Sequence, residues 1–222
     1  MSTELTELFD SNRAWQQDRL ADDPDYFRKL AAQHAPSYLW IGCADARVPA
    51  NEILGLPPGD VFVHRNIANL VVHSDLNAQS VIQFAVDVLK VEHIMVVGHY
   101  RCAGVGAIQH GTRIGLADNW LYHLRDVQDR YAERLQAIPA GTERVDRLCE
   151  LNVLEQVVNV CQTNVVQYAW GRQQSLTVHG WVYGVGDGLL RDLGLTMSGP
   201  EGLAAAHHAA VEAVFAGARP AS

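Results

Sequence analysis

Cysteine, basic residues and long apolar runs are all scarce in this sequence. Its 222 residues include only 4 cysteines, too few for a small domain held together by disulfides. No apolar segment approaches the roughly 20 residues that a membrane-spanning helix needs, so we expect no membrane partner. Lysine and arginine number 17 against 25 acidic residues, which leaves a formal charge of −8 and no basic run. Nucleic acid is therefore a poor candidate as a partner.

The first residues, Met1–Leu5, are polar and acidic, unlike a secretory signal peptide. Together with the few cysteines, this favours the reducing cytoplasm, where thiols stay free to bind a metal. Hydrophobic residues make up 48% of the chain, enough for a substantial core. We predict a single domain, residues 1–222, with a helical arm (1–36), an α/β core (37–199) and a C-terminal helix (200–222).

Short apolar runs alternate with segments of helical periodicity along the core. Strands are expected at 38–43, 61–65, 93–97 and 175–183, with an antiparallel edge strand from Leu189 onward. Helices are expected at 3–20, 24–34, 76–90, 103–109, 120–131, 148–173 and 200–216, the sixth interrupted at 162–164. A helix that connects two buried strands forms a βαβ unit, so the pattern predicts an α/β fold with a mostly parallel sheet flanked by helices.

Chemically active side chains follow two of the predicted strands. Cys43, Asp45 and Arg47 come at the end of the first strand, and His99 and Cys102 follow the third. Because chemistry in open parallel sheets collects beyond the carboxyl ends of the strands, we expect these side chains to share one rim. Two thiols and an imidazole form a ligand set that selects zinc. A closed structural zinc site would have no use for the neighbouring acidic and basic pair, so that alternative is less favoured.

A thiol enzyme without metal is a second alternative. In it Cys43 or Cys102 would be the nucleophile, His99 the base and Asp45 the group that orients the base. The metal content of the protein separates these readings, because a thiol enzyme needs no zinc.

Five motifs, in this order, resemble those of the β-class carbonic anhydrases. They are Cys43-x-Asp45-x-Arg47, His64-Arg65-Asn66-Ile67-Ala68-Asn69, Gly98-His99-Tyr100-x-Cys102-x-Gly104, Cys149-Glu150-Leu151-Asn152-Val153 and His179-Gly180-Trp181-x-Tyr183. The resemblance extends from about residue 38 to residue 195. Two positions depart from the family pattern: Arg101 stands where a small residue is frequent, and Ala103 where glycine is usual.

The resemblance implies a sheet of four or five strands and an N-terminal arm that embraces a partner subunit, in a homodimer or homotetramer. It implies one zinc ion per chain, held by Cys43, His99 and Cys102, with water or Asp45 in the fourth position. The implied reaction is the reversible hydration of carbon dioxide to bicarbonate and a proton. A relative that acts on carbon disulfide or carbonyl sulfide, or a zinc-bearing bicarbonate sensor without turnover, is the alternative.

Asp45 and Arg47 have the chemistry of a catalytic pair. Two thiolates donate more electron density to zinc than histidines do, so such a metal alone should acidify water less. A carboxylate held ionised by a guanidinium can compensate, because it accepts the hydrogen of the reacting water and orients its lone pair towards carbon dioxide.

Trp40, Arg65 and Tyr183 match a second set of residues, which binds bicarbonate in one subgroup of the β class. A guanidinium, an indole N–H and a phenol O–H suit an oxyanion. In that subgroup bicarbonate draws the loop after Cys43 away and separates Arg47 from Asp45. The carboxylate then closes the zinc site, and low pH favours this closure.

The remaining cysteines and histidines have ordinary structural expectations. Cys149 and Cys161 are placed on helix faces and should be core thiols. His207 and His208 are expected to be solvated. A structural hydrogen bond is the default role, and proton transfer the alternative, for His64, His73, His93, His110, His123 and His179.

Overall fold

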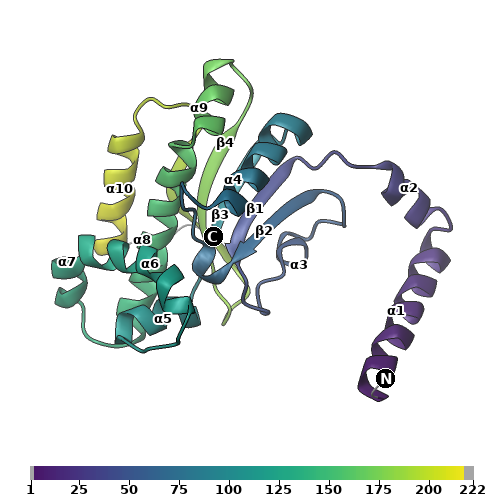
Figure 1. The fold of residues 1–222 in the computed structure, drawn as a ribbon, viewed down its shortest axis with the longest axis horizontal. Helices are drawn as coiled ribbons and strands as arrows, with labels where there is room; N and C mark the ends of the chain where they lie inside the picture. Colours follow the sequence, from purple (N-terminus) through teal and green to yellow (C-terminus); the bar gives the residue numbers. More distant parts are fainter. Residues whose placement is uncertain (1–2, 218–222) are drawn as a thin grey trace. The chain divides into compact units, whose positions relative to one another are not determined.

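The computed structural model describes residues 3–217, which fall into two compact units that meet between Ala35 and Pro36. The first unit contains the helices α1 (Thr3–Asp22) and α2 (Tyr26–Ala32), labelled in Figure 1. The prediction that the second helix begins at Pro24 is wrong. The Asp23 carboxylate accepts the Asp25 N–H at 3.0 Å and closes a turn there, so helical structure starts at Tyr26.

The second unit is built on a five-stranded sheet with the order β2-β1-β3-β4-β5 (Figure 1). Its strands are β1 (Tyr38–Cys43), β2 (Val61–Asn66), β3 (His93–His99), β4 (Thr177–Tyr183) and β5 (Leu190–Met197). The first four are parallel, and β5 pairs with β4 in the antiparallel direction. The predicted fold class, including the antiparallel edge strand, is confirmed.

Helical segments connect the strands, and a last helix follows β5. They are α3 (Ala50–Leu54), η1 (Ile67–Asn69), α4 (Leu76–Gln83), η2 (Phe84–Leu89), α5 (Ala103–His110), α6 (Ala117–Arg130), α7 (Ala132–Ala137), α8 (Thr142–Cys161), α9 (Asn164–Gly171) and α10 (Leu203–Phe215). The predicted interruption at 162–164 is confirmed, since Thr163 caps α9 by accepting the Val166 N–H. The single helix predicted at 76–90 is instead α4 followed by the π-helical η2.

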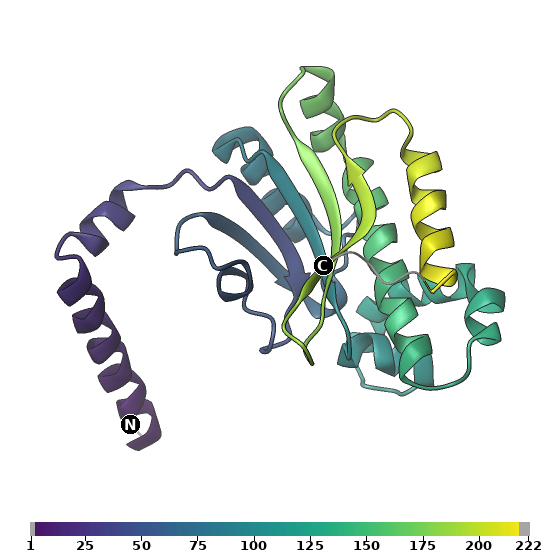
Figure 2. The same ribbon diagram turned by 180° about the vertical axis from the view of Figure 1, so that it is seen from behind.

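The sheet separates two apolar clusters, because successive side chains of a strand point to opposite faces. Leu39 and Ile41 of β1 belong to the larger cluster, which also contains buried side chains of α5, α6, α8 and α10. Figures 1 and 2 show α8 and α10 beside the β4–β5 half of the sheet. Trp40 faces the other way, into a smaller cluster with Met95 and with Ile53 of α3. Within the described residues, no helix combines the length and apolar character needed to cross a membrane.

Candidate metal centre

The carboxyl ends of β1 and β3 bring the predicted ligands together. These strands are parallel neighbours with Gly42 in register with Val97, so Cys43 and His99 emerge at the same edge of the sheet. Cys102 reaches the same place from the residue that precedes α5. The three side chains are buried, and their ligand atoms all lie within 4.8 Å of one another. Within the described part of the chain, this is the one group of His, Cys, Asp and Glu side chains that could hold a metal ion.

The spacing of the two sulfur atoms fits a tetrahedral metal. Cys43 Sγ and Cys102 Sγ are 3.9 Å apart. Two thiolates bound to one tetrahedral zinc, with bonds of about 2.3 Å, lie about 3.8 Å apart. The sulfur atoms therefore already have the separation that a shared zinc ion requires.

His99 presents one nitrogen towards the sulfur atoms and uses the other to fix its ring. Its Nδ1–H donates to the Tyr100 carbonyl oxygen at 3.0 Å. The other nitrogen, Nε2, is buried and has no hydrogen-bond partner. A buried, unpaired nitrogen is costly unless a metal or a donor satisfies its lone pair. The arrangement thus fits a metal ligand.

The two thiols have opposite tendencies to ionise. The adjacent Cys102 thiol, the nearby His99 ring and backbone N–H groups lower the pKa of Cys43 below its ordinary value. The hydrogen bond shared with Cys43, together with burial, raises the pKa of Cys102. The two sulfur atoms thus favour a single negative charge between them, and a bound cation would stabilise a second one.

Asp45 and Arg47 form a bidentate ion pair beside the ligands. Arg47 Nε lies 2.9 Å from Asp45 Oδ1, Nη2 lies 2.7 Å from Oδ2, and the Arg47 N–H donates to Oδ1 at 3.0 Å. The Arg47 hydrogen bonds hold the pKa of Asp45 well below its usual range. Asp45 Oδ2 is also 3.8 Å from His99 Nε2, so an ionised carboxylate adjoins the candidate metal position.

The three predicted anion-binding residues have different surroundings in the structure. Trp40 is fully buried, its Nε1 has no partner, and Tyr183 packs against the same small cluster. Arg65 instead donates from Nε to the Cys43 carbonyl at 2.7 Å and from Nη2 to the Asp45 carbonyl.

Outside this centre the expectations are met in part. Cys149 and Cys161 are buried, as predicted, and burial raises the pKa of both thiols. The expectation that His207 is solvated is wrong. Its Nε2 lies 3.0 Å from Glu155 Oε1, because α10 packs against α8 and places the ring on that buried carboxylate. His208 is exposed.

Comparison with known proteins agrees with this geometry. The family model described as carbonic anhydrase matches residues 38–190. A carbonic anhydrase from Emericella nidulans is 50% identical over 192 residues, which cover 86% of this chain and 84% of that protein. The chain belongs to the β-class carbonic anhydrases.

Solved structures of β-carbonic anhydrases share this fold over most of the chain. A tetrameric enzyme from Sordaria macrospora gives a TM-score of 0.85 at 40% identity, covering 88% of this chain and 100% of that one. A Coccomyxa enzyme in complex with acetazolamide gives a TM-score of 0.86 at 41% identity, covering 92% of each chain.

One contact to the ligands was not predicted from the sequence. The Ala68 N–H donates to Cys43 Sγ at 3.4 Å. The one signal for this contact in the sequence is that Ala68 lies inside one of the five family motifs.

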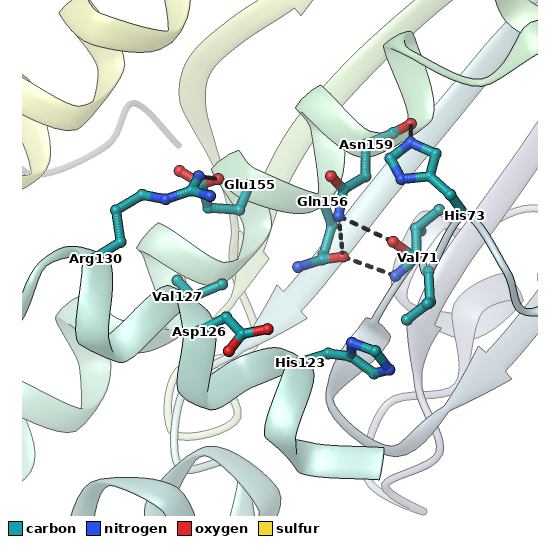
Figure 3. A pocket seen from close by; sticks show the side chains of 10 residues that line it. Val71, His73, His123, Asp126, Val127, Arg130, Glu155, Gln156 and Asn159 are labelled. Atoms are coloured by element: carbon teal, nitrogen blue, oxygen red, sulfur yellow. Dashed lines mark hydrogen bonds and ion pairs between the residues drawn. The ribbon is translucent and has the colours of Figure 1, made fainter. Parts of the chain in front are cut away.

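A polar cavity of about 200 Å³ lies between α6, α8 and residues 71–73 (Figure 3). None of the three candidate metal ligands lines it.

Proposed function

We propose that this β-carbonic anhydrase catalyses the zinc-dependent, reversible hydration of carbon dioxide to bicarbonate and a proton. One zinc ion per chain would be held by Cys43, His99 and Cys102. The observation that carries this proposal is the buried, unpartnered His99 Nε2 beside two thiols at metal-binding distance. Two thiolates and a neutral imidazole balance the charge of a divalent zinc ion. Metal-binding thiolates must stay reduced, so we place the protein in a reducing compartment such as the cytoplasm.

The residues around the metal divide the chemistry between them. When bound, zinc supplies a Lewis acid that lowers the pKa of water. Asp45, kept ionised by Arg47, accepts the hydrogen of the reacting water and turns its lone pair towards carbon dioxide. Arg47 also donates from Nη2 to the Arg101 carbonyl at 3.3 Å, which ties the pair to the segment that carries Cys102. Both carboxylate oxygens of Asp45 bind Arg47, so in this arrangement Asp45 would not occupy a ligand position of the metal.

The second part of the proposal is inhibition by bicarbonate at a site made by Trp40, Arg65 and Tyr183. The unpaired Trp40 Nε1 is a free donor for an oxyanion. An anion that attracts the Arg65 guanidinium would compete with the carbonyl groups of Cys43 and Asp45 that it now contacts. Release of these carbonyls would loosen the segment that carries Asp45 and free it to block the metal site.

The third part of the proposal is a homodimer or homotetramer joined through the arm. Leu5, Leu8 and Phe9 of α1 are 50%, 64% and 56% exposed, respectively. A second copy of the chain is the partner that we propose for this apolar surface. The tetrameric Sordaria macrospora relative is consistent with such an assembly.

Stopped-flow measurement of carbon dioxide hydration, with zinc quantified on the same sample, tests the proposal. We expect about one zinc per chain and a hydration rate that disappears on chelation and returns with zinc. Inhibition by thiol alkylation in a preparation that contains no zinc would instead indicate a thiol enzyme. Zinc without carbon dioxide hydration would direct the assay to carbon disulfide and carbonyl sulfide as substrates, or to a non-catalytic bicarbonate sensor.

A further inference from the structure

The turn after β2 has an unusual backbone where it touches Cys43. Ala68 has φ 65° and ψ 28°, and the next residue, Asn69, has φ 47°. Residues other than glycine are uncommon in this left-handed conformation, and for Ala68 it has a cost in backbone free energy. It directs the Ala68 N–H to Cys43 Sγ, and both residues are buried.

A side chain of α8 holds the opposite end of this residue. Asn152 Nδ2 donates to the Ala68 carbonyl oxygen at 2.9 Å, and Asn152 is 1% exposed. The Asn152 Oδ1 atom accepts a hydrogen bond from Gln156 Nε2 at 3.0 Å, so a residue one turn further along α8 fixes the orientation of the Asn152 amide group. Gln156 Oε1 in turn accepts the Val71 N–H at 2.8 Å.

A third carboxamide continues the same row. Asn159 Nδ2 donates to the Val71 carbonyl oxygen at 2.9 Å and to Gln156 Oε1 at 3.1 Å. Figure 3 shows Gln156 and Asn159 beside Val71, at the edge of the polar cavity. Asn152, Gln156 and Asn159 occupy one face of α8 because their spacing is i, i+4 and i+7. Only the first of them contacts Ala68 in these interactions.

We propose that Asn152 is a positioning residue for the metal centre, acting through Ala68 on the sulfur of Cys43. The proposal rests on the assignment of Cys43 as a zinc ligand. A hydrogen bond from an N–H group to a buried thiolate orients the lone pairs of the sulfur. It also reduces the negative charge that the sulfur can donate to a metal. Asn152 fixes the Ala68 peptide so that its N–H stays on the sulfur despite the unfavourable backbone conformation.

Asn152→Leu and Asn159→Leu are a matched pair of variants for the test. Each replaces a carboxamide of α8 with a side chain of similar size and removes a donor to a backbone carbonyl oxygen of the 66–71 segment. Both should lower the denaturant midpoint. Only Asn152→Leu should weaken zinc binding, measured by competition with a chelator, by about 10- to 100-fold. Only that variant should shift the thiolate-to-metal charge-transfer band of the cobalt-substituted protein.

A measurement on the unaltered protein keeps the test decisive if Asn152→Leu does not fold. In protein loaded with cadmium-113, a hydrogen bond from Ala68 to a metal-bound sulfur transmits a scalar coupling from cadmium to the Ala68 amide proton. We expect this coupling in the parent and in Asn159→Leu. Its absence from the parent would overturn the proposal.

The outcomes separate this proposal from the function on which it rests. Equal zinc affinity and equal charge-transfer energy in the two leucine variants would overturn the role of Asn152 while leaving the zinc site in place. Zinc binding that is the same in Cys43→Ser as in the parent would instead remove the assignment of the ligand.

Discussion

Replacing Asp45 with asparagine removes its charge but leaves its size unchanged, and is the sharpest test of the catalytic pair. In the parent, both carboxylate oxygens accept from the Arg47 guanidinium, and Oδ1 also accepts the Arg47 N–H. An amide group keeps one oxygen for Arg47 but presents an NH₂ group where the second acceptor stood. Such a group cannot accept the hydrogen of the reacting water.

The effects on stability and on turnover should differ greatly in size. The Arg47 side chain is 51% exposed, so solvent screens its ion pair with Asp45 and the pair contributes little to stability. Loss of a positioned acid–base group typically costs about 100- to 10,000-fold in rate, which corresponds to about 2.7–5.4 kcal/mol. The catalytic loss should therefore exceed the loss of stability.

Asp187→Asn is the matched control for this substitution. Asp187 also accepts a backbone N–H two residues later, from Leu189 at 3.1 Å, and also pairs with an arginine, Arg191. The control should lose a comparable amount of stability and keep its turnover number. The assay is stopped-flow hydration of carbon dioxide by both variants, with zinc content and denaturant unfolding measured on the same samples.

Two results would contradict the role of Asp45. One is a near-normal hydration rate in Asp45→Asn with zinc bound. The other is an equal loss of rate in Asp45→Asn and Asp187→Asn. Because Arg47 holds the pKa of Asp45 well below its usual range, the carboxylate stays ionised at neutral pH, so the deficit should persist throughout the neutral range.

Four further predictions concern the metal, regulation, assembly and pH. Cys102→Ser should lose most of its zinc and unfold at lower temperature, since metal binding is coupled to folding; full zinc occupancy would refute the ligand. Tyr183→Phe should weaken bicarbonate inhibition, and an unchanged bicarbonate dependence at several pH values would exclude the second site. Removal of residues 1–20 should dissociate or precipitate the protein, whereas a stable, active monomer in sedimentation would contradict the role of the arm. Burial lowers the pKa of His64 and His179 below the ordinary 6.5. As the pH falls, these histidines therefore take up protons in the unfolded chain before they do so in the folded chain, and the free energy of unfolding should decrease below about pH 6.5. His179→Gln should reduce this slope in denaturant unfolding measured at several pH values, and an unchanged slope would contradict its cause.

The sequence was most informative where local pattern and burial agree. The apolar run before Cys43 and the one that begins at His93 are buried strands, and each is followed by the ligands that were read from the pattern. It was less informative about short helices and about helix boundaries. Neither α3 nor α7 was predicted, because each has too few residues to show a helical period. The long helix α8 begins at Thr142, six residues before the predicted start at Leu148.

The sequence by itself determined which side chains are candidate metal ligands and which strand ends carry them, because a buried parallel strand is encoded by its own residues. It also placed Asp45 two residues from the arginine that binds it, which makes their pairing a local property. Only the tertiary structure decided the backbone of Ala68 and the partner of His207. The Ala68 carbonyl oxygen accepts a hydrogen bond from a side chain 84 residues away, and His207 contacts a glutamate 52 residues away. Contacts over such distances arise from the packing of α8 and α10, and no local pattern encodes them.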